Sequence, residues 1–314
     1  MIHDSSVHLT VGDLYDRAIR TGGSRVAITQ GERSFTYAEL GRNATSVVAG
    51  LQAIRLGKND RVAFLMANCA EYLFCEYAMA KAGATRVPLA VALGNDDHIH
   101  MMNFARCKVL VYHEKLAARV QEMLPQLTTV EHFICVADAA TSVAAGHLHL
   151  QTMIAAQAPA PRPVAVKPED IAGIYFTGGT TGKPKGVMLS HRSWFYTYYV
   201  EMLEFGLGQR ETFIFTTPMT HAGGCLLLPV LLRQGRCVLL DHFDADELLA
   251  TIEKERASAV LVVPTMLYVL LDHPRRDSYD RSSLRNLLYG ASSTTTGPRY
   301  RQASRAKSLC ARPT

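Results

Sequence analysis

The residues from Tyr175 to His191, YFTGGTTGKPKGVMLSH, combine glycine, threonine and lysine behind a short apolar run. Glycines lack a Cβ atom, so their backbone N–H groups can converge on an anion. Threonine hydroxyls add hydrogen-bond donors, and lysines add positive charge. Because the preceding run, IAGIYFT, is typical of a strand, the pattern predicts a phosphate-binding loop. The candidate residues are Thr177, Gly178, Gly179, Thr180, Thr181, Gly182, Lys183 and Lys185.

This loop differs from two common nucleotide-binding motifs. It has no GK[ST] after a correctly spaced glycine, which argues against a P-loop kinase or NTPase. It has no GxGxxG either, so a Rossmann dinucleotide site is not supported. From composition alone, a mobile surface turn rich in glycine and threonine is the alternative.

Histidine and small residues follow two later apolar runs. His221 ends TFIFTTPMTH, where an imidazole can donate to a carboxylate or line a pocket. Gly223 and Gly224 follow it and leave space for a substrate tail. The alternative is a structural histidine with satisfied hydrogen bonds. After LRNLLYG, the residues Gly290, Ala291 and Ser292 could form a plain strand-to-helix turn.

Two HxH pairs, His98/His100 and His147/His149, could chelate a metal ion from a strand. Neither pair has a cluster of carboxylates or cysteines nearby in the sequence. We therefore interpret both pairs as solvated and predict no metal-binding residues.

The elements that must position these residues alternate between apolar runs and helical patterns. Thr36 and Glu39 have the spacing of a capping box at the start of a helix whose apolar face extends to Ile54. The alternation predicts an α/β fold with βαβ units, mostly parallel sheets and layered helices. Strands are expected at 60–68, 86–91, 108–112, 132–136, 171–177, 212–218, 236–240, 258–264 and 284–290, and helices at 70–83, from 190, near 226–232 and at 245–256.

Proline density divides the chain. Pro159, Pro161, Pro163 and Pro168 stiffen a predicted linker at 156–170. It separates a first α/β subdomain, residues 1–155, from a second, residues 171–298, that contains the phosphate loop. Residues 299–314 are basic and poor in apolar side chains, and we expect them to be disordered.

Bulk composition excludes several functional classes. The net charge of +5 comes from that basic tail, and the remaining 28 basic residues equal the 28 acidic ones, so no nucleic-acid partner is expected. The seven scattered cysteines form no CxxC pair and are interpreted as reduced thiols. No signal peptide is recognisable, and the run ASAVLVVPTMLYVLL is too short to span a bilayer. We therefore expect a cytoplasmic protein.

The phosphate-loop stretch resembles the signature of the adenylate-forming acyl-CoA synthetases, the AMP-binding superfamily that includes firefly luciferase. Further blocks match in order over about residues 9–298: FTYAEL, DRVAFLMANCAEYL, KAGATRVPL, TTPMTHAGG and LLYGAS. Gly178 departs from the family pattern, in which serine is commoner. The resemblance implies an acyl-CoA-synthetase-like N-terminal domain that is incomplete at its C-terminus.

The resemblance also implies a two-step reaction. A carboxylic acid attacks the α-phosphate of Mg·ATP to give acyl-AMP and pyrophosphate, and coenzyme A then displaces AMP. Thr177, Thr180, Thr181 and Lys185 would contact the β- and γ-phosphates, and Lys183 less certainly. His221 would line the acyl pocket beside the carboxylate. The turn Gly290, Ala291 and Ser292 would pack on the adenine.

Parts of the family pattern are missing after Pro298. A YGxTE block, whose glutamate helps to hold Mg²⁺, and a later catalytic lysine do not occur in this sequence. Each such electrostatic element is typically worth on the order of 10²–10³ in rate. We therefore expect this chain alone to have little ligase activity.

The leading interpretation is an acid–thiol ligase that activates a carboxylic acid, with a fatty acid favoured, present as an impaired and truncated chain. An aryl-acid CoA ligase and an adenylation domain that loads a carrier protein are alternatives of the same class. A non-catalytic nucleotide- or acyl-binding remnant is the alternative of another class.

Overall fold

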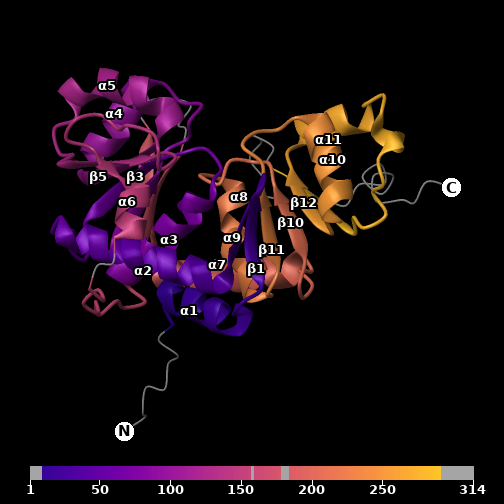
Figure 1. Cartoon of the computed structure of the whole chain (residues 1–314), viewed down its shortest axis with the longest axis horizontal. Helices are drawn as coiled ribbons and strands as arrows, with labels where there is room; N and C mark the ends of the chain where they lie inside the picture. The colour runs from indigo at the N-terminus through magenta and orange to yellow at the C-terminus, as the bar shows by residue number, and fades with distance from the viewer. Residues whose placement is uncertain (1–8, 157–158, 178–183, 291–314) are drawn as a thin grey trace, which may run out of the picture. The chain divides into compact units, whose positions relative to one another are not determined.

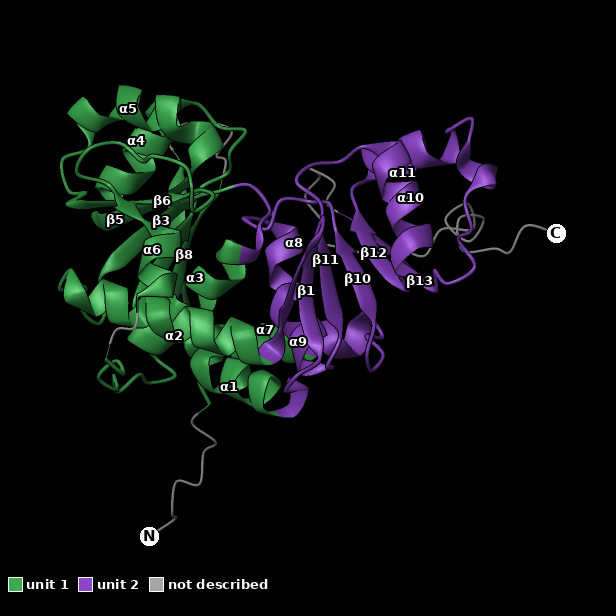
Figure 2. Ribbon diagram, viewed as in Figure 1, with its two compact units in different colours: residues 1–20, 38–66, 71–199 green, residues 21–37, 67–70, 200–314 purple. Residues whose placement is uncertain are grey.

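A computed structural model describes residues 9–156, 159–177 and 184–290 of the chain. The chain divides into two compact units (Figure 2). Unit 1 comprises residues 1–20, 38–66 and 71–199, and unit 2 comprises residues 21–37, 67–70 and 200–314.

Unit 1 is built on a sheet with the strand order β7-β6-β5-β3-β4-β8-β9. All neighbours are parallel except β8 and β9, which are antiparallel. Its strands are β3 (Arg61–Leu65), β4 (Thr85–Pro88), β5 (Cys107–His113), β6 (His132–Val136), β7 (Leu148–His149), β8 (Ile171–Thr177) and β9 (Lys185–Ser190).

Helices cover both faces of this sheet (Figure 1). On one face, Met101, Met102, Val120 and Met123 join a core cluster with side chains of β3, β4, β5 and β6. On the other face, the Phe64 ring of β3 packs edge-on against the Tyr72 ring of α3, with the ring centroids 5.4 Å apart. The helices are α1 (Val11–Gly22), α2 (Tyr37–Ala53), α3 (Ala70–Ala82), α4 (Asn95–Phe104), α5 (Ala117–Met123), α6 (Leu150–Ala155) and α7 (His191–Glu204), with short 3₁₀ turns at Glu114–Leu116 and Leu124–Gln126.

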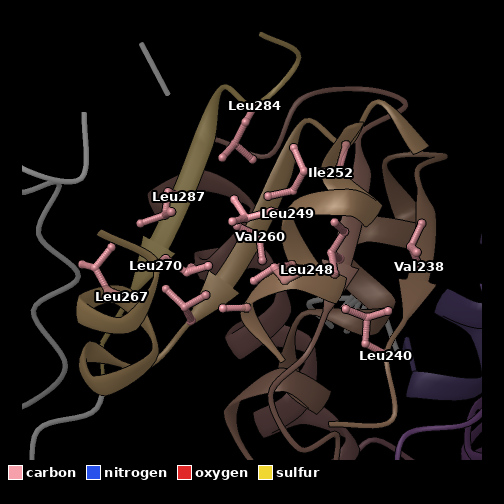
Figure 3. Close-up of a cluster of buried hydrophobic side chains, with 14 residues drawn as sticks. Val238, Leu240, Leu248, Leu249, Ile252, Val260, Leu267, Leu270, Leu284 and Leu287 are labelled. Atoms are coloured by element: carbon pink, nitrogen blue, oxygen red, sulfur yellow. The ribbon is translucent and has the colours of Figure 1, made fainter. Parts of the chain in front are cut away.

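Unit 2 contains a second sheet with the order β13-β12-β10-β11-β1-β2, in which only β2 is antiparallel to its neighbour. Its core lies between the sheet and α10, whose Leu248, Leu249 and Ile252 are buried together with strand side chains (Figure 3). The strands are β1 (Val26–Gln30), β2 (Arg33–Thr36), β10 (Thr212–Phe215), β11 (Arg236–Leu239), β12 (Ala259–Val262) and β13 (Asn286–Tyr289). The helices are α8 (Ala222–Cys225), α9 (Leu227–Leu232), α10 (Ala245–Glu255) and α11 (Pro264–Leu271), with a 3₁₀ turn at Arg276–Ser278.

Local sequence signals explain several boundaries. Asp244 caps α10 by accepting a hydrogen bond from the Glu247 N–H at 2.8 Å. Pro264 occupies the first turn of α11, where its missing N–H costs no helical hydrogen bond. Gly83 follows α3 with φ +65°, a conformation that glycine adopts without strain.

The predicted α/β fold with mostly parallel sheets is confirmed, whereas some local predictions were incomplete. The strand β9 was predicted as part of the loop, and α4 was not predicted at all. The proline-rich segment has no regular structure in its described part and lies within unit 1. The division at 156–170 stays a proposal, and residues 299–314 lie outside the described residues.

Two further observations concern the described residues only. No helix there is long and apolar enough to cross a bilayer. None of the described cysteines forms a disulfide bond: Cys69, Cys75, Cys107, Cys135, Cys225 and Cys237.

Candidate functional site

The phosphate-binding candidates in unit 1 lie at the mouth of a β-hairpin. β8 and β9 pair antiparallel, and Thr177 lies opposite Lys185 in their register. Both side chains are exposed. The structure therefore brings the first and last predicted phosphate contacts together. Between them, Gly178, Gly179, Thr180, Thr181, Gly182 and Lys183 lie outside the described residues.

Gly186 of β9 lies close to a side chain of β8. A Cβ atom on Gly186 would lie 2.8 Å from the Ile174 Cγ2 atom of β8. A larger residue would force the Ile174 side chain or the local backbone to shift beside the Thr177–Lys185 pair. The glycine adjoining Lys185 thus has a packing role in the hairpin.

A buried ion pair supports the β8 strand. Glu76 of α3 pairs with Arg86 of β4, with side chains only 3% and 8% exposed. Arg86 also hydrogen-bonds the Tyr175 hydroxyl two residues before Thr177. Burial raises the pKa of Glu76 against the opposing effect of Arg86. The pKa of Arg86 is raised well above its ordinary value by Glu76 and neighbouring tyrosines, although burial acts to lower it.

His191, at the end of the signature stretch, has a structural role. Its side chain is fully buried, and its Nδ1 accepts a hydrogen bond from the Val11 N–H at 3.2 Å. The backbone N–H of His191 donates to the Asp170 carbonyl oxygen at 3.0 Å. Burial lowers the pKa of His191 to about 4, so the imidazole is neutral at pH 7. The hydrogen bond of its side chain therefore connects the start of α7 to the start of α1.

In unit 2, His221 lies at the start of α8, on the loop that follows β10. Its side chain is exposed, and Nδ1 lies 2.8 Å from the Thr220 carbonyl oxygen. The side chain is thus available to a ligand. Its predicted contact with a carboxylate stays a prediction.

Gly223 and Gly224 differ from one expectation. Each was expected to leave open space, but a Cβ atom on Gly224 would lie 2.0 Å from the Met219 carbonyl oxygen. The corresponding atom on Gly223 would lie 2.8 Å from the Thr217 carbonyl oxygen. The expectation of open space was wrong on this side, because the backbone of the preceding loop already fills it. Their role in substrate binding stays a prediction.

The adenine candidates begin at Gly290, directly after β13. Tyr289 pairs with Val262 of β12, and β12 is parallel to β10. The His221 loop and Gly290 therefore follow β10 and β13 at the same carboxyl edge of the sheet, and these two strands lie two strand positions, or about 10 Å, apart. Ligands of open α/β sheets bind outside this edge. Ala291 and Ser292 lie outside the described residues.

The HxH pairs required a correction. The interpretation of His98 as solvated was wrong: it is fully buried on α4, where Nε2 lies 2.9 Å from the Ala90 carbonyl oxygen. Burial lowers its pKa. His147 is also half-buried and stacks on Phe133, with ring centroids 4.8 Å apart. Helical geometry turns residues i and i+2 to different sides, so His98 and His100 do not form a chelating pair.

A cavity of about 310 Å³ opens elsewhere in unit 1, between α1, α2 and the proline-rich segment. None of the predicted site residues in the described ranges lines it. Its lining includes Thr10, Asp13, Thr45, Lys81, Arg162 and Val164.

Comparisons with known proteins identify relatives over most of the chain. A feruloyl-CoA synthase of an Amycolatopsis species is 33% identical over 87% of this chain and 52% of its own length. A medium/long-chain-fatty-acid–CoA ligase of Mycobacterium tuberculosis is 28% identical over 91% of this chain and 50% of its own length. The chain thus spans about half the length of the curated relatives it matches.

Solved structures show the same fold. An anthranilate CoA ligase in complex with anthranoyl-AMP superposes with a TM-score of 0.84 at 21% identity, covering 91% of this chain and 55% of its own. The N-terminal domain of a Mycobacterium tuberculosis protein, FACL13, gives a TM-score of 0.82 at 24% identity, covering 90% and 70%. The model of the AMP-binding enzyme family matches residues 15–305, so the chain belongs to this family.

Proposed function

We propose that the protein takes part in ATP-dependent activation of a carboxylic acid to an acyl-adenylate, followed by transfer of the acyl group to the thiol of coenzyme A. The observation that carries this proposal is the β8–β9 hairpin, with Thr177 and Lys185 opposite each other at the mouth of a loop rich in glycine and threonine. The relatives named as CoA ligases support the same reaction class.

In this proposal the hairpin loop holds the ATP phosphates. Backbone N–H groups of the loop glycines and the threonine hydroxyls donate to phosphate oxygens, while Lys185 supplies charge. Mg²⁺ would bind together with the nucleotide, through its phosphate oxygens.

The acid would bind at the carboxyl edge of the unit 2 sheet. His221 would donate a hydrogen bond to the incoming carboxylate and hold it for attack on the α-phosphate, and the segment from Gly290 would contact the adenine. Such orientation lowers the barrier by fixing the attack geometry in advance.

For the acid we propose a molecule with an apolar body, a fatty acid first. An aryl acid is the second candidate, favoured by the 33% identity to a feruloyl-CoA synthase. A carrier-protein thiol in place of coenzyme A is a further alternative. Acid-dependent exchange between ATP and pyrophosphate, measured with saturated fatty acids and hydroxycinnamic acids in parallel, distinguishes the two classes of acid.

The relatives are about twice as long as this chain, and we propose that the 314-residue chain alone turns over slowly. A chain that binds ATP without acid-dependent exchange would be a nucleotide-binding remnant instead. A cytoplasmic location is also proposed, since the described cysteines form no disulfide bond.

The decisive experiment is calorimetric titration of the full chain with Mg·ATP, comparing wild type with Lys185→Ala. A charge-assisted hydrogen bond is worth about 1.5–3 kcal/mol, so the variant should bind ATP about 10- to 150-fold more weakly. Lys254→Ala is the control, because Lys254 is also exposed and lies in unit 2 beside Glu32. Equal ATP affinities for the two variants would refute the assignment of Lys185.

A further inference from the structure

Asn68 is a buried amide in unit 2 whose side chain bonds only to backbone. It is 4% exposed and lies in the short segment between β3 and α3. Its Nδ2 donates to the carbonyl oxygens of Thr217 and Leu240, each at 3.0 Å. Its Oδ1 accepts from the Met219 N–H at 2.8 Å. The single side chain therefore uses both N–H donors and its carbonyl oxygen.

These bonds join three places at the carboxyl edge of the sheet. Thr217 follows β10, Leu240 follows β11, and Met219 lies on the loop between β10 and α8. A carboxylate of the same shape has no donor for the two carbonyl oxygens. A buried carbonyl that loses its donor costs more than the hydrogen bond contributed, so the asparagine is chemically specified here.

The loop that Asn68 holds leads directly to His221 and has little room to shift. The His221 N–H donates to the Pro218 carbonyl at 3.1 Å. On its other side, the Met219 carbonyl oxygen occupies the place where Gly224 would carry a Cβ atom. A displacement of Met219 would therefore move the backbone on both sides of His221.

We infer that Asn68 is a positioning residue for the acid-binding side of the site: it fixes the Thr217–Met219 loop and, through it, the place of His221. This role deepens the proposed function, since His221 matters for the reaction only if the acid binds beside it. Among the described residues, the Asn68 side chain bonds to backbone atoms. Its effect on the acid would therefore be indirect, through the position of His221.

The test compares wild type with Asn68→Asp, which keeps the side-chain shape and removes both donors. Asn103→Asp is the matched control, because Asn103 also donates from Nδ2 to a carbonyl, that of Gln126 at 2.8 Å, and accepts the Thr128 N–H at 3.0 Å. Asn103 belongs to unit 1, whereas the His221 loop belongs to unit 2.

Two readouts by NMR and hydrogen exchange follow the loop itself. In wild type, the Met219 amide should exchange slowly because it is bonded to a buried side chain. In Asn68→Asp it should exchange about 10- to 100-fold faster, and the His221 imidazole signals should shift. If Met219 exchanges at the rate of an open loop in wild type, the inference is wrong, whether or not the variant folds. It is equally wrong if Asn103→Asp moves the His221 signals as much.

A binding readout connects the loop to the proposed function. The probe is a non-hydrolysable acyl-sulfamoyl adenosine with a medium-length saturated chain. Asn68→Asp should bind it about tenfold or more weakly, with ATP affinity changed less than about twofold. Equal losses for both ligands would overturn the inference. If wild type binds neither ligand, the proposed function fails, whereas the exchange experiment still decides the role of Asn68 in the loop.

Discussion

Replacing Glu76 by glutamine would test how strongly the buried ion pair supports the β8–β9 hairpin. The substitution removes the negative charge and keeps nearly the same shape. The guanidinium of Arg86 then stays buried without its counter-ion. Its remaining neighbours include the Tyr72 and Tyr175 rings, whose centroids lie 6.0 and 5.7 Å from the guanidinium carbon.

The expected magnitude follows from burial. Removing one partner of a buried pair costs about 3–5 kcal/mol, because the other charge is left uncompensated. Cation–π contacts of about 0.5–2 kcal/mol offset part of this loss. We expect Glu76→Gln to lower the free energy of unfolding of unit 1 by about 2–4 kcal/mol, which corresponds to a fall in Tm of roughly 5–15 °C.

The chain provides its own probe for this measurement. Trp194 is the single tryptophan of the sequence, and its ring lies 5.3 Å from that of Tyr175. Tryptophan fluorescence during urea unfolding therefore follows unit 1 around the hairpin. The control is Glu169→Gln, since Glu169 also pairs with an arginine, Arg192, but with side chains 62% and 52% exposed.

An exposed pair contributes about 0–1 kcal/mol, so the control variant should unfold close to wild type. If Glu76→Gln lowers the midpoint no more than Glu169→Gln does, the buried pair does not stabilise the hairpin support and the argument fails. A loss of stability without any loss of ATP affinity would show that the pair does not affect the proposed phosphate site.

Two further predictions concern other residues of the site. Burial lowers the pKa of His191 to about 4 from an ordinary 6.5, so its stability contribution is complete above about pH 6.5 and is lost as the pH falls towards 4. Urea unfolding between pH 7 and pH 4 should show about 3 kcal/mol less pH-dependent loss for His191→Asn than for wild type, and a variant profile identical to that of wild type would contradict the assignment. Gly224→Ala should lower the stability of unit 2 by about 1–3 kcal/mol or more, since the new methyl group meets the Met219 carbonyl oxygen. Gly94→Ala, whose Cβ would meet nothing within 4 Å, should cost less than about 1 kcal/mol in thermal unfolding, and a similar cost for both would refute the packing argument.

Much of the fold was predictable because its strands are short apolar runs between breakers. The strand at 132–136 and the helix from Ala245 were predicted with nearly the observed bounds. β9 was missed because KGVMLS has no apolar alternation and becomes a strand only by pairing with β8. α8 was missed because AGGC has two glycines, which are poor helix formers.

The site shows a similar division between local and long-range signals. The glycine, threonine, lysine and histidine residues of the candidate site could be predicted from the sequence, because the functional group of each residue indicates the ligand that it could bind. Asn68 and Arg86 bond to residues 89 to 172 positions away, and Glu76 acts through its ion pair with Arg86. No pattern of spacing marks such contacts, and each residue alone resembles an ordinary polar residue near the end of a strand or in a helix.

This division has a physical cause. Residues that contact a ligand need particular functional groups, and a small set of groups binds phosphate or carboxylate. Residues that hold the contacting loops need only complete the hydrogen bonds of buried backbone and charge, which many side chains could do in other folds. For this reason the variants at Asn68 and Glu76 test the site more sharply than further changes within the signature stretch. They test whether the fold, and not only the motif, sets the geometry of the proposed site.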